Sequence, residues 1–143
     1  MDGEAWDGDD QAADYNFKII LVGNSGVGKT SITSRYVDNE FSEEQKRSKK
    51  VKIQHKFFTI PNTQPAKVAD LHLWDTLGQE KFHAIADIFF KGSVGAIIVF
   101  DLSNRNSFDE LDKWWQKVND CCDASVVAML VGNKCDLPNR TVT

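Results

Sequence analysis

Eight residues near the start of the chain have the types and spacing needed to hold a phosphate group. Residues 23–30 read G-N-S-G-V-G-K-T and match the pattern G-x-x-x-x-G-K-[ST]. Glycines let the backbone approach an anion closely, and successive N–H groups before a helix form a nest for it. Lys29 adds a charge for the β- and γ-phosphates, and the Thr30 hydroxyl can ligate Mg²⁺. The predicted binding residues are Ser25, Gly26, Val27, Gly28, Lys29, Thr30 and Ser31; the alternative is a glycine-rich turn with an exposed lysine.

A second candidate group follows an apolar run that ends in an acid. Residues 71–80 read L-H-L-W-D-T-L-G-Q-E, and Asp75 stands where a carboxylate would hold the water shell of Mg²⁺ beside the phosphates. Gly78 offers a flexible joint and a backbone N–H for a γ-phosphate, and Gln79 could orient an attacking water. The segment therefore predicts nucleotide hydrolysis, with Gln79 and Lys29 as the catalytic residues.

A third group of residues is predicted to contact the base of a nucleotide. Residues 129–136 are M-L-V-G-N-K-C-D, an apolar strand followed by polar side chains. A carboxylate accepts from N–H groups, and guanine presents N1–H and N2–H₂ side by side where adenine has no such pair. Asp136 is therefore predicted to read guanine, Asn133 to contact the acceptor edge of the base, and the Lys134 stem to lie over the ring. Taken alone, this motif is more often a solvated turn than a base pocket. In order after the other two motifs, and at a strand end, it favours a base pocket.

These three segments, in this order, resemble those of the Ras-like small GTPases, and of the Rab branch most closely. The resemblance covers residues 17–138; W-D-T-L-G-Q-E-K-F at 74–82 is similar to the Rab stretch W-D-T-A-G-Q-E-R-F. It implies a switch in vesicle traffic that binds GTP or GDP with Mg²⁺ and hydrolyses GTP. It also implies effector, exchange-factor and activating proteins that bind through residues 42–56 and 76–91. An ATPase is disfavoured because Asp136 does not match adenine.

The segment corresponding to the first switch of the family departs from the family pattern. Counted from Lys29, Phe41 corresponds to the aromatic residue that packs beside guanine, and this residue type is kept. Ser48 corresponds to a threonine that binds Mg²⁺, so the predicted metal ligands are Thr30, Ser48 and Asp75. The family's Thr-Ile-Gly becomes Ser-Lys-Lys within a basic run at 46–52. This run is either a solvated loop or an altered surface for an acidic partner.

Two further departures weaken the prediction of an active enzyme. Leu77 replaces the alanine that the family has beside its catalytic glycine, and a branched side chain there would displace Gln79. Positioning dominates catalysis of phosphoryl transfer, so we expect slow hydrolysis. Family members continue with a further strand, a base-contacting loop and a final helix, whereas this chain ends at Thr143. We therefore expect a C-terminally incomplete domain, bare apolar surface over residues 17–22 and 94–100, and no prenyl anchor. The alternative function is a truncated or pseudo-GTPase fragment that only binds partners.

Length, composition and charge predict one globular domain behind a short acidic leader. The chain has 143 residues, 41% hydrophobic and 27% charged, which suits a single core. Residues 1–14 hold six acids and no base, so we expect a disordered leader there and a G domain over 15–143. No apolar stretch is long enough to span a membrane, and nothing resembles a secretory signal. We expect a cytoplasmic protein with no nucleic-acid partner, at an endomembrane surface only if an extension or a partner supplies an anchor.

Apolar runs and helical stripes alternate along the chain, which predicts an α/β fold. Expected strands are 17–22, 51–60, 68–74, 94–100 and 126–131, and expected helices are 28–37, 79–91 and 107–120. The last helix shows a capping-box pair, Ser107 and Glu110, and an apolar stripe that includes Trp115. Turn residues at 62–65 predict an antiparallel hairpin of the second and third strands. The predicted fold is a P-loop NTPase domain, with a mostly parallel sheet and helices on both faces.

Overall fold

The computed structural model describes residues 12–41, 52–76 and 87–143. Its strands are β1 (Tyr15–Val22), β2 (Lys52–Ile60), β3 (Lys67–Asp75), β4 (Gly95–Asp101) and β5 (Val127–Asn133). Its helices are α1 (Lys29–Asp38), α2 (Asp87–Phe90), α3 (Arg105–Asp109) and α4 (Leu111–Cys121). Every predicted strand is present, with its ends moved by no more than two residues.

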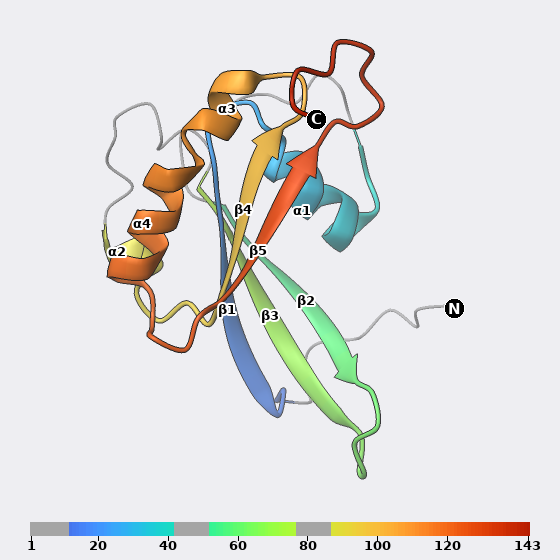
Figure 1. Cartoon of the computed structure of the whole chain (residues 1–143). Helices are drawn as coiled ribbons and strands as arrows, with labels where there is room; N and C mark the ends of the chain where they lie inside the picture. The colour runs from blue at the N-terminus through green and yellow to red at the C-terminus, as the bar shows by residue number, and fades with distance from the viewer. Residues whose placement is uncertain (1–11, 42–51, 77–86) are drawn as a thin grey trace.

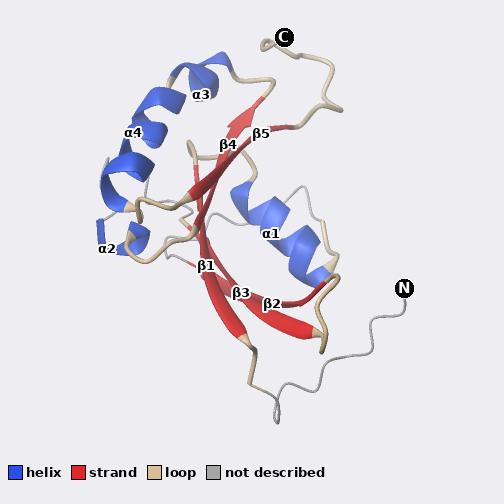
Figure 2. Cartoon of the chain, turned by 60° about the horizontal axis from the view of Figure 1, so that its bottom comes forward, coloured by secondary structure: helices blue, strands red, loops and turns tan. Residues whose placement is uncertain are grey.

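The strands form one sheet in the order β2-β3-β1-β4-β5 (Figure 1). β1 is parallel to β3 and β4, β4 is parallel to β5, and β2 is antiparallel to β3. Figure 2 shows α1 on one side of the sheet and α2, α3 and α4 on the other. The predicted architecture is thus confirmed. Because four strands run in the same direction, their carboxyl ends meet at one edge of the sheet, where such folds place their ligand loops.

The β2–β3 hairpin is also confirmed, with Lys52 opposite Asp75 and Ile60 opposite Lys67. The Thr63 hydroxyl holds the turn, because it donates to the Ile60 carbonyl at 2.9 Å and accepts from the Lys67 N–H at 2.8 Å. This turn sets the register of the two strands.

The predicted helix over 107–120 is two helices, and its predicted capping box is wrong. α3 begins at Arg105, and the side chain of Asn104 accepts hydrogen bonds from the backbone N–H groups of Asn106 and Ser107. Glu110 lies between α3 and α4 and makes no side-chain cap. Ser107 is buried, and its hydroxyl accepts from the Asp101 N–H at 2.9 Å. Of the predicted helix 79–91, residues 79–86 lie outside the described part of the chain, and α2 covers Asp87–Phe90.

Two clusters of buried apolar side chains form the core. The larger lies between the sheet and helices α2 and α4 and comprises Ile20, Val22, Phe90, Ala96, Ile98 and Val118. Trp114 packs against it, whereas Trp115, a member of the apolar stripe predicted for this helix, is 48% exposed at the rim. The smaller cluster comprises Phe100, Leu102 and Val142. It forms because the N–H groups of Thr141 and Val142 both donate to the Leu102 carbonyl, at 2.8 and 3.1 Å.

The most exposed apolar side chains of the sheet lie on β5, and not on the two segments, 17–22 and 94–100, where bare apolar surface was predicted. Leu21 of β1 and Val99 of β4 are 1% and 0% exposed. On β5, by contrast, Val127, Met129 and Leu130 are 74%, 62% and 59% exposed. β5 is one of the two edge strands of the sheet, so it pairs with β4 alone.

The start of the described chain is attached to the sheet. Asp14 pairs with Val68 in both directions: its N–H donates to the Val68 carbonyl at 2.9 Å, and its carboxylate accepts from the Val68 N–H at 2.8 Å. Residues 1–11 of the predicted leader lie outside the described residues. Within the described ranges, no helix combines the length and the apolar character that crossing a bilayer requires.

Candidate functional site

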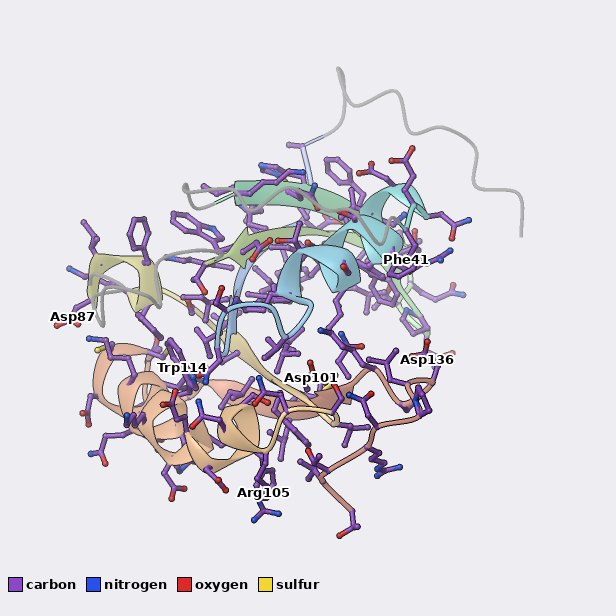
Figure 3. All side chains as sticks on the ribbon, turned by 90° about the horizontal axis from the view of Figure 1, so that it is seen from above. Phe41, Asp87, Asp101, Arg105, Trp114 and Asp136 are labelled. Atoms are coloured by element: carbon purple, nitrogen blue, oxygen red, sulfur yellow. The ribbon has the colours of Figure 1, made fainter. Side chains whose placement is uncertain are left out.

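The loop between β1 and α1 lies at the carboxyl edge of the sheet, which Figure 3 views from above. Gly28 caps α1 in a left-handed conformation, with φ 104°. A Cβ at Gly28 would come 2.2 Å from Asn133 Nδ2, and one at Gly23 would come 2.2 Å from the Val99 carbonyl oxygen. These two glycines are therefore required by the close approach of β4 and β5. A Cβ at Gly26, with φ 80°, would meet no atom within 4 Å, so this part of the loop faces open space.

Lys29 lies inside the loop and is only 1% exposed. Its ammonium donates to the carbonyls of Gly23 at 2.8 Å and Asn24 at 3.0 Å. The alternative of a turn with an exposed lysine therefore does not describe this loop. The lysine stem is buried and its charge is held among the backbone groups of the loop.

Two of the three predicted metal ligands lie together. Thr30 Oγ1 donates to Asp75 Oδ2 at 2.5 Å, and Asp75 is 1% exposed at the end of β3. The next residue, Thr76, donates from its hydroxyl to the Leu21 carbonyl at 2.7 Å, which holds the end of β3 against β1. A hydroxyl beside a buried carboxylate is a set of hard oxygen donors, so these residues fit Mg²⁺. The third predicted ligand, Ser48, lies outside the described residues.

The segment after β5 is bound directly to the phosphate loop. Asn133 Nδ2 donates to the Val27 carbonyl at 2.9 Å, and Lys134 Nζ donates to the Gly26 carbonyl at 2.7 Å. Asp136, two residues further, is exposed. Figure 3 shows Asp136 and Phe41 on the same side of the molecule, and Phe41 is 58% exposed. The predicted phosphate and base segments are therefore in direct contact.

Asp101 belongs to this network and was not predicted. It ends β4, is 5% exposed, and its Oδ2 lies 2.9 Å from Lys134 Nζ. Its Oδ1 accepts from the N–H and the hydroxyl of Ser103, at 2.8 and 2.6 Å. Burial opposes ionisation of this carboxyl, but the bonds from Ser103 and Lys134 outweigh burial and lower its pKa. The sequence signal that could have identified Asp101 is an acid directly after an apolar strand, as at Asp75.

Trp114 is a second residue that sequence reasoning did not place at the site. Its indole N–H donates to the Asn24 side-chain oxygen at 2.9 Å, which ties α4 to the phosphate loop. The sequence carries no signal for this pair, because the two residues meet only through the packing of α4 on the sheet.

Several predicted site residues lie outside the described part of the chain. These are Ser48, Gly78 and Gln79, together with Leu77 and most of the predicted partner-binding ranges, at 42–51 and 77–86. Their assignments stay predictions from the sequence.

Comparison with known proteins supports the family resemblance that the motifs indicate. The family model of the Ras family matches residues 18–143. Similar curated proteins are the Ras-related proteins RABA4d of Arabidopsis thaliana, 42% identical over 89% of this chain, and Rab11A of Lotus japonicus, 38% identical over 89%. The Ras-related protein RIC2 of Oryza sativa subsp. japonica is 41% identical over 87% of this chain. The chain spans 55%, 54% and 55% of the lengths of these three relatives. The chain therefore belongs to the Ras family, as a Rab-like small GTPase.

Proposed function

We propose that this chain binds GTP and GDP with Mg²⁺ and hydrolyses GTP slowly, as a Rab-like switch in vesicle traffic. The observation that carries the proposal is the pair of hydrogen bonds from Asn133 and Lys134 to the carbonyls of Val27 and Gly26. They hold the base-reading segment against the phosphate loop, so one ligand with a base and a phosphate chain can contact both.

The phosphate end of this ligand would lie against the loop and α1. The backbone N–H groups of residues 25–31 precede and open the helix, where its dipole favours an anion. The Lys29 ammonium, now bonded to two loop carbonyls, would exchange these for phosphate oxygens with little movement of its buried stem. Thr30 and Asp75, with Ser48, would hold Mg²⁺, which when bound neutralises charge on the phosphate oxygens.

The base end would lie beyond Lys134. The Asp136 carboxylate is exposed and accepts two N–H groups from guanine, whereas adenine would leave it unpaired. The Asn133 amide nitrogen has two hydrogens, and its bond to Val27 uses one of them, so the other can donate to the acceptor edge of the base. The Phe41 ring would cover an adjacent side of the base.

We further propose that Gln79 orients the attacking water while Lys29 stabilises the charge that develops on the transferred phosphate. Turnover is slow in this proposal, because Leu77 crowds Gly78 and Gln79. Effector, exchange-factor and activating proteins would bind residues 42–56 and 76–91. The protein would act in the cytoplasm, and at an endomembrane surface where an extension or a partner supplies an anchor.

A second candidate function is partner binding without turnover, and the surface of β5 favours it. Val127 and Met129 are exposed on one face of β5 and Leu130 on the other, next to the base segment. An edge strand with exposed apolar side chains is a candidate interaction site. A fragment with this edge would bind a partner whether or not it held a nucleotide.

Nucleotide competition separates these functions. The full chain, loaded with a fluorescent GDP analogue and Mg²⁺, is titrated with GTP, GDP and ATP. We expect displacement by both guanine nucleotides and none by ATP at the same concentrations. Equal displacement by ATP would remove the guanine assignment, and failure to bind the analogue would leave partner binding as the function.

A further inference from the structure

Two histidines and an aspartate meet on the sheet away from the nucleotide loops. His55 lies on β2 directly opposite His72 on β3, and Asp70 precedes His72 by two residues. Side chains two apart on a strand point to the same face, so all three share one face of the hairpin. The side chains of His55, Asp70 and His72 are 51%, 13% and 31% exposed, which leaves the cluster open to solvent on one side.

The three side chains converge on one point. His55 Nδ1 lies 3.2 Å from both carboxylate oxygens of Asp70, and His72 Nε2 lies 3.0 Å from Oδ2. The two imidazole rings have centroids 4.3 Å apart. One ligand atom from each residue can be chosen so that all three lie within 4.8 Å of one another.

We propose that His55, Asp70 and His72 form a binding site for a divalent cation of the zinc class. Two imidazole nitrogens and one carboxylate oxygen are the ligand set of open three-ligand zinc sites. Metal–ligand bonds of about 2.0–2.1 Å at tetrahedral angles place ligand atoms about 3.3 Å apart. The two separations from Asp70 already match this spacing. The third separation, between the two ring nitrogens, is no more than 4.8 Å, and rotation of the exposed His55 ring would shorten it. Water would fill the fourth position.

The charges around the cluster suit a cation. In the described part of the chain, the two histidines are the ion-pair partners of Asp70, and no lysine or arginine pairs with it. Lys18 stands beside His72 across the β1–β3 register, but its ammonium is bound elsewhere. It donates to the Lys91 carbonyl at 2.9 Å and lies 3.8 Å from the centre of the Trp74 ring. A bound metal would take one nitrogen of each neutral imidazole, and the single ring proton would then lie on the other nitrogen.

Ligand chemistry separates this site from the predicted magnesium site. Mg²⁺ takes oxygen ligands, which Thr30 and Asp75 supply, whereas imidazole nitrogen favours zinc, copper, nickel or cobalt. The metal would link β2 to β3 and stabilise the hairpin by mass action. The site is independent of the proposed nucleotide function, because none of its ligands belongs to the nucleotide loops.

The test is a calorimetric titration of Zn²⁺ into the full chain, with and without GDP and excess Mg²⁺. The three cysteines, Cys121, Cys122 and Cys135, are first changed to serine so that thiols cannot bind zinc. We expect one saturable site per chain, present in both nucleotide conditions, and a rise in melting temperature with zinc. His55→Gln, His72→Gln and Asp70→Asn should each weaken zinc binding at least tenfold.

Two substitutions serve as controls. Lys56→Gln changes the neighbour of His55 on β2, which points to the other face toward Tyr36. His83→Gln removes the remaining histidine of the sequence. Both should leave zinc affinity unchanged. If a variant fails to fold, the cysteine-free parent is titrated with Co²⁺ instead, and its visible spectrum tests the proposal. Tetrahedral ligation of Co²⁺ by nitrogen and oxygen gives intense visible bands, which we expect to see. Absence of a saturable site and of these bands, or equal zinc binding by the His55, His72 and Asp70 variants, would overturn the proposal.

Discussion

Lys29 shows how one residue can serve both the fold and the ligand. Its stem is buried and its ammonium bonds to the carbonyls of Gly23 and Asn24, so the loop holds its shape around the charge. Residue type and spacing predicted the charge and its position at the start of the helix. They did not predict that Gly23 and Gly28 are required by Val99 and Asn133, because those contacts come from other strands.

The side chain of Leu77 is expected to limit the rate of GTP hydrolysis. If this side chain displaces Gln79, Leu77→Ala should increase the single-turnover rate of GTP cleavage at saturating Mg²⁺. A tenfold increase corresponds to about 1.4 kcal/mol of barrier. Gln79→Leu should slow cleavage in both backgrounds. A Leu77→Ala chain no faster than the parent would show that crowding does not limit the reaction.

Asp101 gives a prediction for the dependence of stability on pH. Its pKa is below the ordinary value of about 4, despite burial, because Ser103 and Lys134 bond to the carboxylate. The ionised form therefore stabilises the fold above pH 4, and this contribution is lost as the pH falls through the folded pKa.

The measurement is urea denaturation of the parent and of Asp101→Asn between pH 7 and pH 3. We expect the variant to be less stable by about 1 kcal/mol at pH 7, with the difference shrinking below pH 4. Asp109→Asn is the control, because that acid forms a surface pair with Arg105 in which both side chains are more than half exposed. A difference for Asp101→Asn that is constant over this pH range would contradict the assignment.

The elements show which local signals determine structure and which do not. The continuous apolar run at 94–100 predicted β4, because a strand covered by helices on both sheet faces needs such side chains. Turn residues at 62–65 predicted the pairing of β2 with β3. The start of α3 was misplaced because Ser107 and Glu110 have capping-box spacing while the cap that forms is Asn104. Ser107 instead bonds to Asp101, a tertiary contact that local pattern does not reveal.

Asn104 should therefore carry the stability that the capping box was expected to provide. Asn104→Ala removes the acceptor for two backbone N–H groups and should cost about 1 kcal/mol in the free energy of unfolding. Asn104→Asp keeps the acceptor and should restore most of the loss. Glu110→Ala should change stability by less than about 0.5 kcal/mol. Chemical denaturation measures all three, and a larger loss at Glu110 than at Asn104 would favour the capping box.

At the scale of the whole molecule, the order of the strands explains which contacts of the candidate site the sequence could predict and which it could not. Motifs at the ends of β1, β3 and β5 were predicted to converge because parallel strands end at one edge. The bonds from Lys134 to Asp101 and from Trp114 to Asn24 depend on the strand order and on where α4 packs. No local pattern in the sequence contains that information.

The exposed edge at β5 predicts self-association. An edge strand with exposed Val127, Met129 and Leu130 offers backbone groups and apolar side chains to another copy. Light scattering after size exclusion should show a larger mass at higher concentration, and Met129→Lys should reduce it. Ile88→Lys, at a 71% exposed site outside the sheet, should leave the measured mass unchanged. A monomer at every concentration would contradict this prediction.

The most direct test of a single guanine-nucleotide site is to exchange the base contact at Asp136. Asp136→Asn replaces an acceptor with a side chain that can donate, so it should weaken GDP binding and strengthen binding of xanthosine diphosphate, whose C2 carries an oxygen. Loss of a charged hydrogen bond of about 1.5–3 kcal/mol predicts a decrease of ten- to a hundredfold or more in GDP affinity. We expect the preference for guanine over xanthine to reverse in this variant while the parent prefers guanine. An unchanged preference would show that Asp136 does not read the base and that the two loops do not form one nucleotide site.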